Sequence, residues 1–200
     1  GAYVKDPQVG MHKWVMSFDL NSLYPHLIMQ YNISPETLVN GGAKIVEGMV
    51  DKLLNGKAKN DTEYCMTPNG AFFRKDVKGF LPELMENMYN DRVKYKKLLL
   101  EAKQEYENLG DPAQLKLISR YENIQMAKKI SLNSAYGAIG NNWFRYFDLL
   151  VATAITSSGQ LSIRWIEKAI NIHLNKILKT DKVDYVIASD TDSVYITLDL

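Results

Sequence analysis

With 200 residues, 46% of them hydrophobic, the chain can bury a sizeable core as one large domain or two small ones, which excludes intrinsic disorder. Its formal net charge of +1 excludes a uniformly polybasic nucleic-acid binder, so any anion site must be local. The single cysteine, Cys65, excludes an internal disulfide, and no apolar run is long enough to span a bilayer.

The first predicted elements are a strand and a helix that meet at an acid. The apolar run at about residues 13–18 predicts a strand that ends at Asp19, and residues 22–31 follow with the apolar spacing of a helix. Pro25 is tolerated there because it falls in the first helical turn. Since strand ends present functional groups, Asp19 is a candidate site residue.

Weaker patterns follow. A short amphipathic piece at residues 46–54 precedes Pro68-Asn69-Gly70, which predicts a hairpin turn between strands at residues 64–67 and 71–75.

Residues 81–109 carry the strongest helical pattern, a single apolar stripe that ends at Gly110. A second helix is predicted to start after Asp111, with Asp111 as N-cap, a proline in the first position and Gln114 closing a capping box. So tight a connection makes the two helices antiparallel, which predicts an α-hairpin over residues 81–136.

The base of this hairpin gathers polar side chains. Arg92 and Lys96 share a face of the first helix, and the second helix carries Lys129, Asn133 and Tyr136 at the spacing of one face. Antiparallel pairing brings these two regions together. A solvated basic face is the ordinary alternative, although a tyrosine followed by glycine is unusual at an exposed helix end.

The last predicted elements are a long helix at about residues 149–178 and a hairpin. Small residues at 152–159 are expected to let the helix pack closely beneath a sheet, and Trp165 is expected in the core. Two β-rich runs, 183–188 and 194–198, then flank a short polar tip, which predicts a β-hairpin.

Two acids, Asp190 and Asp192, stand at this tip. Turn chemistry alone explains them, since Asp and Ser are common turn residues. Two carboxylates held this close nevertheless repel, unless a cation lies between them or one stays protonated, and oxygen ligands favour Mg²⁺. The end of the first strand is well placed to bring Asp19 to the same point.

These groups together suit phosphoryl or nucleotidyl transfer, which needs charge neutralisation and alignment more than covalent chemistry. Two Mg²⁺ ions would activate the attacking hydroxyl and stabilise the leaving pyrophosphate. The triphosphate would be held by basic side chains and by exposed amides at a helix start: Arg92, Lys96, Lys129, Ser22, Leu23 and Tyr24.

Three segments resemble motifs of the family B DNA polymerases, in that family's order. Residues 17–25 (SFDLNSLYP) resemble motif A, residues 129–137 (KISLNSAYG) motif B, and residues 189–193 (SDTDS) motif C. Chance agreement at all three is improbable. Other segments, such as NWFRY at 142–146, are similar to segments of the replicative polymerases of T-even-like bacteriophages.

The resemblance implies an α+β fold, in which an antiparallel sheet packed on helices forms a polymerase palm and an inserted antiparallel α-hairpin forms the fingers. The palm would comprise residues 1–80, with motif A, and 137–200, with the motif C hairpin. The fingers would comprise residues 81–136, with motif B at their end.

The resemblance also implies roles for the site residues. Asp19 and Asp192 would ligate both Mg²⁺ ions, Leu20 would supply a backbone carbonyl, and Asp190 a supporting carboxylate. Arg92, Lys96 and Lys129 match the family's triphosphate grip, and Asn133 belongs to the same face. Tyr136 would stack near the nascent base pair, and Tyr24 would lie under the sugar and exclude a 2′-OH.

The implied function is that of a DNA-directed DNA polymerase, which adds deoxynucleoside triphosphates to the primer of a primer–template DNA. Its partners would be exonuclease and thumb parts that we expect outside this chain, and a sliding clamp, with no membrane. The location would be cytoplasmic, in the bacterial host for a viral enzyme. An inactive nucleotide-binding or nucleic-acid-binding fragment of a split or truncated polymerase is the alternative, and a reverse transcriptase or nucleotide cyclase would have different fingers.

Overall fold

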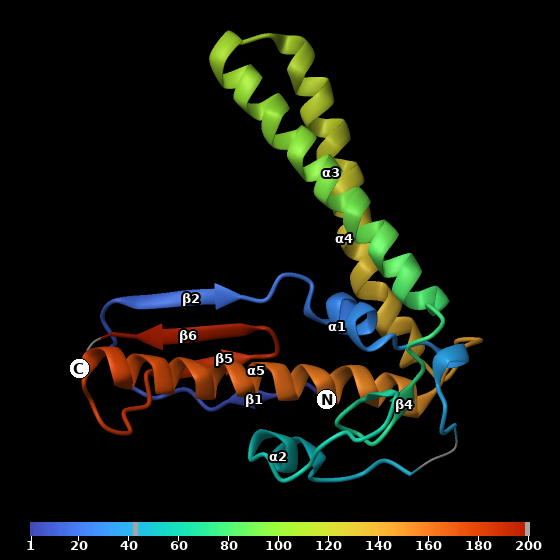
Figure 1. The fold of residues 1–200 in the computed structure, drawn as a ribbon. Helices are drawn as coiled ribbons and strands as arrows, with labels where there is room; N and C mark the ends of the chain where they lie inside the picture. Colours follow the sequence, from blue (N-terminus) through green and yellow to red (C-terminus); the bar gives the residue numbers. More distant parts are fainter. Residues whose placement is uncertain (42–43, 199–200) are drawn as a thin grey trace.

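The computed structural model describes residues 1–41 and 44–198. Helices and a small antiparallel sheet form an α+β fold, as predicted. A four-stranded sheet and one long helix make up the body, and a helical hairpin stands away from it (Figure 1).

The four-stranded sheet joins strands from both ends of the chain. Its order is β1-β5-β6-β2, with every neighbouring pair antiparallel, and the strands are β1 (Val4–Lys5), β2 (Val15–Asp19), β5 (Val186–Asp190) and β6 (Ser193–Thr197). The predicted first strand and C-terminal hairpin are therefore confirmed. Asp19 pairs with Ser193, so the end of β2 is level with the β5–β6 turn.

The strand β2 forms one edge of this sheet and is exposed along its whole length. Its apolar side chains, together with the adjoining Trp14, remain accessible to solvent: Trp14 is 80% and Phe18 54% exposed. The core of the sheet lies instead against its other strands.

The helix α5 (Leu149–Leu178) has the predicted bounds and packs on the sheet. Ile163 is fully buried there with Val186, Val194 and Ile196. Trp165 was wrongly expected in the core, because it is 62% exposed. Its neighbour Ile166 packs against the core of the four-stranded sheet instead. Successive residues are rotated by about 100° around a helix axis, so Trp165 points away from that core.

The small residues at the start of α5 do not belong to the core of the four-stranded sheet but pack against other elements, among them β4. Ala152 and Ala154 belong to a second core cluster with Ile28 of α1 (Leu23–Tyr31) and Leu132 of the projecting hairpin. Close packing at this end of α5 therefore supports α1, the helix that follows the Asp19 strand.

The segment between α1 and the helical hairpin is built from short elements: η1 (Pro35–Thr37), α2 (Met49–Leu54), β3 (Cys65–Met66) and β4 (Phe72–Phe73). The predicted hairpin around Asn69 is confirmed with shorter strands. One reason is that the chain bonds elsewhere directly after β4, since the amide of Arg74 donates a 2.8 Å hydrogen bond to the carbonyl of Thr37.

The projecting hairpin consists of α3 (Phe80–Leu109) and α4 (Pro112–Ile139), which are antiparallel as predicted (Figure 1). Gly110 ends α3 with a φ of 65°, and the carboxylate of Asp111 caps α4 by accepting a 2.9 Å hydrogen bond from the amide of Ala113. The capping-box role of Gln114 was wrong, because its Oε1 has no hydrogen-bond partner among the described residues and its Nε2 donates to Glu105 of α3.

The second helix of the hairpin is longer than predicted. The predicted α-hairpin ended at residue 136, but α4 continues to Ile139, whose side chain is 1% exposed in the same core as Ile28. Burial of this last turn explains why the helix runs through Gly137.

Candidate functional site

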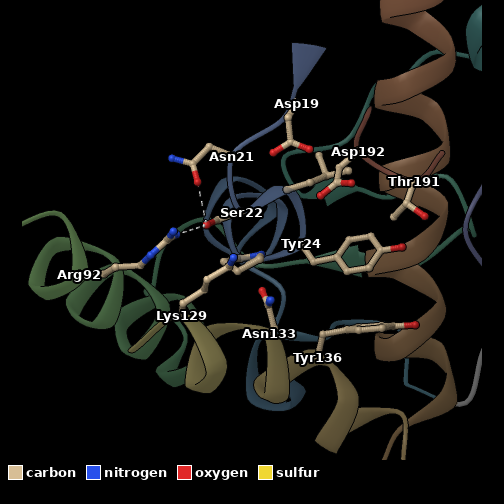
Figure 2. Close-up of a pocket in the computed structure, with 12 residues that line it drawn as sticks. Asp19, Asn21, Ser22, Tyr24, Arg92, Lys129, Asn133, Tyr136, Thr191 and Asp192 are labelled. Atoms are coloured by element: carbon tan, nitrogen blue, oxygen red, sulfur yellow. Dashed lines mark hydrogen bonds between the residues drawn. The ribbon is translucent and has the colours of Figure 1, made fainter. Parts of the chain in front are cut away.

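A cavity of about 550 Å³ lies where the end of β2, the start of α1, the β5–β6 turn and the base of the helical hairpin meet (Figure 2). Nine of the predicted site residues line it: Asp19, Ser22, Leu23, Tyr24, Arg92, Lys129, Asn133, Tyr136 and Asp192. Asn21, Pro25 and Thr191 also line the cavity and were not predicted. Leu20, Lys96 and Asp190, which were predicted, are not among its lining residues.

Two carboxylates, those of Asp19 and Asp192, lie on one side of the cavity (Figure 2). The β2–β6 pairing places Asp19 opposite Ser193, whose hydroxyl donates a 3.0 Å hydrogen bond to the Asp19 carboxylate. The amide of Leu20 donates a 2.8 Å hydrogen bond to the carbonyl of Asp192. Main-chain pairing thus brings the two acids together from opposite ends of the chain.

The electrostatics of this pair favour a cation. Burial raises the pKa of Asp192, and the negative charges of Asp19 and then Asp190 raise it further. Within residues 1–41 and 44–198, no three His, Cys, Asp or Glu side chains form a ready set of metal ligands. Two carboxylates nevertheless suit Mg²⁺, which is commonly held by one or two carboxylates, with waters and substrate phosphates completing its shell.

The turn between the acids has a strained residue at its centre. Thr191 has a φ of 54°, a left-handed conformation that is costly for a β-branched side chain. Its amide donates a 2.9 Å hydrogen bond to the carbonyl of Tyr3, and its hydroxyl donates one of 2.9 Å to the Asp190 carboxylate. That carboxylate is engaged with the turn, which is consistent with its place outside the cavity lining.

The opposite side of the cavity is basic. Arg92 of α3 donates a 3.1 Å hydrogen bond from Nη1 to the hydroxyl of Ser22, whereas its Nε is buried without a partner among the described residues. An unpaired buried donor is costly, so an anion beside Arg92 would satisfy it. Lys129 faces the same cavity from α4, whereas Lys96 lies one helical turn beyond Arg92 and is exposed outside it.

Two tyrosines form the floor of the site. The rings of Tyr24 and Tyr136 have centroids 4.7 Å apart at 48° (Figure 2). Gly159 of α5 lies against Tyr24, and a Cβ at that position would stand 2.9 Å from Tyr24 Cε1. Sequence reasoning recognised Gly159 only as a small residue, because its contact with Tyr24 spans more than a hundred residues.

Comparison with known proteins identifies the family to which this site belongs. The sequence profile described as DNA polymerase family B matches residues 1–200. The chain belongs to DNA polymerase family B. The resemblance seen in the three motifs is therefore confirmed, and polymerases of this family generally depend on metal ions.

Relatives within DNA polymerase family B include enzymes of the T-even type, as expected. The chain is 33% identical over 241 residues to the DNA-directed DNA polymerase of Escherichia phage RB69, and 34% identical over 241 residues to that of Enterobacteria phage T4. Each alignment covers 100% of this chain and 26% of the relative. DNA polymerase 1 of Pyrococcus abyssi is 32% identical over 199 residues, 99% of this chain and 21% of the relative.

The chain thus spans about a quarter of the length of the phage relatives that it matches. Among the helices of the described residues, none combines the length and apolar character needed to cross a membrane.

Proposed function

We propose that this chain is the palm and fingers of a DNA-directed DNA polymerase, which transfers deoxynucleotides to the 3′ end of a primer. The observation that carries this proposal is that an acid pair faces basic side chains and two tyrosines within one cavity. The palm is assigned to residues 1–80 and 137–200 and the fingers to residues 81–136. Primer–template DNA, exonuclease and thumb parts, and a sliding clamp are the proposed partners.

Asp19 and Asp192 would hold the metal ions of this site, with the carbonyl of Leu20 and the carboxylate of Asp190 in support. Bound Mg²⁺ would lower the pKa of the primer hydroxyl and neutralise charge on the leaving pyrophosphate. The protein's own contribution is to hold the two acids at the end of paired strands, where burial and then the charge of Asp19 raise the pKa of Asp192.

The triphosphate of the nucleotide would lie against Arg92 and Lys129, with Asn133 beside them and Lys96 at greater distance. The unpaired Nε of Arg92 is a donor available to a phosphate oxygen. The first turn of α1, at Ser22, Leu23 and Tyr24, adds amides that have no acceptor within the helix.

The base and sugar of the nucleotide would lie over the two tyrosines. Tyr136 would stack near the new base pair. Tyr24 would close the space beside C2′, and its position against Gly159 leaves it no room to retreat from a 2′-OH.

A second candidate is a nucleotide-binding fragment without catalysis. It is favoured by the coverage of the relatives, because the matched part is only 26% of the phage RB69 polymerase.

Primer extension in Mg²⁺ separates these candidates. The chain is tested with a labelled primer–template and deoxynucleotides, with Asp19→Asn as the matched variant and nucleotide binding measured in parallel. Extension by the wild-type chain but not by Asp19→Asn supports the polymerase, whereas nucleotide binding without extension supports the binding fragment. Normal extension by Asp19→Asn contradicts the assignment of the acids.

A further inference from the structure

A buried carboxylate lies beneath the acid-bearing turn. Glu167 of α5 is only 9% exposed and accepts a hydrogen bond from the hydroxyl of Ser189, which is 2% exposed. Charged side chains are rarely buried to this extent unless they are paired, yet no ion pair of Glu167 is found among the described residues. Charge neutralisation therefore does not explain why Glu167 is buried against Ser189, the residue before Asp190.

A second contact of Glu167 reaches the same turn by another route. Tyr3 and Glu167 line the same surface pocket, and burial and then the charge of Glu167 raise the pKa of the Tyr3 hydroxyl. The Tyr3 ring is also held from one side by the guanidinium of Arg164, 5.4 Å from its centroid. The carbonyl of Tyr3 in turn accepts the hydrogen bond from the amide of Thr191.

These two routes converge on the strained residue of the turn. A left-handed Thr191 persists only when surrounding contacts over-determine its conformation. Ser189 fixes the strand that enters the turn, and Tyr3 fixes the amide at its centre. Glu167 bonds to the first of these tethers and lies beside the second.

We propose that Glu167 is a positioning residue, which acts through Ser189 and Tyr3 to hold the Asp190-Thr191-Asp192 turn in the conformation that presents Asp192 to the cavity. Glu167 does not line that cavity, so it acts on the reaction only through the turn. The part of this proposal that concerns activity rests on the proposed polymerase function, whereas the part that concerns the turn does not.

The variants are chosen to separate the polar contacts from packing. Glu167→Met keeps the volume and removes both contacts, whereas Glu167→Gln retains groups able to bond to Ser189 and Tyr3. Ser189→Ala removes one route and covers the case in which Glu167→Met does not fold. Ile163→Val, one turn earlier on α5 and fully buried against the same strands, is the matched control for loss of packing alone.

Amide hydrogen exchange without metal is the first measurement. Glu167→Met is expected to accelerate exchange at Thr191 about tenfold relative to amides within α5, as expected for the loss of a hydrogen bond to a charged group. Ser189→Ala should accelerate it less, and Glu167→Gln should stay close to wild type. Ile163→Val should change the exchange at Thr191 no more than that of the surrounding core.

Single-nucleotide incorporation is the second measurement. Loss of a group that supports a metal ligand lowers activity by roughly ten- to a hundredfold, so Glu167→Met should lower kcat by that factor while the KM for the nucleotide changes little. Glu167→Gln should restore most of the rate. Adding Ser189→Ala to Glu167→Met should cost little more, because both act along one route.

Unchanged exchange at Thr191 in both Glu167→Met and Ser189→Ala would overturn the proposal, as would an equal change in Ile163→Val. If the wild-type chain does not extend a primer, the proposed function fails for this chain, and the exchange measurement still decides whether Glu167 holds the turn.

Discussion

The amide nitrogen of Leu20 lies 2.8 Å from the carbonyl oxygen of Asp192, and this hydrogen bond ties the end of β2 to the turn of the C-terminal hairpin. The contact joins main-chain atoms on both sides. The backbone positions of Asp19 and Asp192 are therefore fixed by sheet pairing, and only their side-chain rotamers are left to adjust to a ligand.

Asp192→Asn should stabilise the folded chain at neutral pH in the absence of divalent ions. Because the folded pKa of Asp192 is raised, its contribution is favourable below the unfolded pKa and is lost as pH rises through the folded pKa. At pH 7 the ionised group therefore costs stability. We expect a rise in Tm of about 1–2 °C, since solvent screens a partly exposed group, and no difference near pH 3.

Asp184→Asn is the control, for which we expect a change in stability at pH 7 of the opposite sign. Burial alone would raise the pKa of Asp184, but hydrogen bonds from Lys5 and Asn171 and the charge of Lys5 outweigh it, so the net pKa is lowered. Its contribution is present above the unfolded pKa and lost as pH falls through the folded pKa. Thermal melts should show Asp184→Asn less stable than wild type at pH 7 and equal to it in acid. A gain at pH 7 in both variants would mean that loss of net negative charge, rather than local position, controls stability.

Lys129→Ala and Lys96→Ala should differ in their effects on nucleotide use. Lys129 lines the cavity, whereas Lys96 lies outside it on α3. Loss of a charge-assisted contact to phosphate costs about 2 kcal/mol, so Lys129→Ala should lower kcat/KM roughly thirtyfold. Lys96→Ala should lower it about threefold or less. Steady-state kinetics with one deoxynucleotide tests the pair, and equal losses would contradict the arrangement of the basic side chains.

Tyr24→Ala should relax the discrimination between deoxynucleotides and ribonucleotides. Its ring stands between Tyr136 and α5, and its removal would open space beside C2′ of the sugar. We expect the kcat/KM ratio of deoxynucleotide to ribonucleotide to fall at least tenfold, as for loss of a steric clash of about 1.4 kcal/mol. Tyr24→Phe keeps the ring and should keep the ratio. If Tyr24→Ala left the ratio of deoxynucleotide to ribonucleotide kcat/KM unchanged, Tyr24 would not be the residue that excludes the 2′-OH.

Gly159→Ala should displace Tyr24 and so change the shape of the cavity. The added Cβ would stand 2.9 Å from Tyr24 Cε1, so the tyrosine must shift toward the cavity. Such overpacking costs about 1–3 kcal/mol of stability, and the shifted ring should lower kcat/KM for deoxynucleotides.

Gly137→Ala is the matched helix control. Gly137 lies within α4 with nothing within 4 Å of the position that a Cβ would take. Alanine should therefore stabilise this helix by about 0.5–1 kcal/mol, measurable by urea denaturation. If Gly159→Ala raised the free energy of unfolding as much as Gly137→Ala, the Tyr24 ring would have to shift without any loss of stability, which would contradict this prediction.

Local sequence signals predicted most of the elements. The bounds of α5 and the end of α3 at Gly110 follow from apolar spacing and end signals that act within a few residues. Eight of the nine predicted residues that line the cavity lie in the three motifs, and the ninth, Arg92, was predicted from helical spacing. Failures arose where a residue's place depends on distant partners: the contact of Gly159 with Tyr24, the buried last turn of α4, and the bond between Glu167 and Ser189.

The open edge of β2 has a consequence for handling the isolated chain. Its main chain is hydrogen-bonded to β6 on one side, and no strand of the described residues pairs with its other side, while Trp14 and Phe18 are exposed to solvent. An apolar edge strand that is open on one side is a template onto which a further strand adds, so concentrated solutions of this chain should self-associate strand to strand. A low protein concentration, or a charged residue in place of Phe18, would keep the chain monomeric in solution.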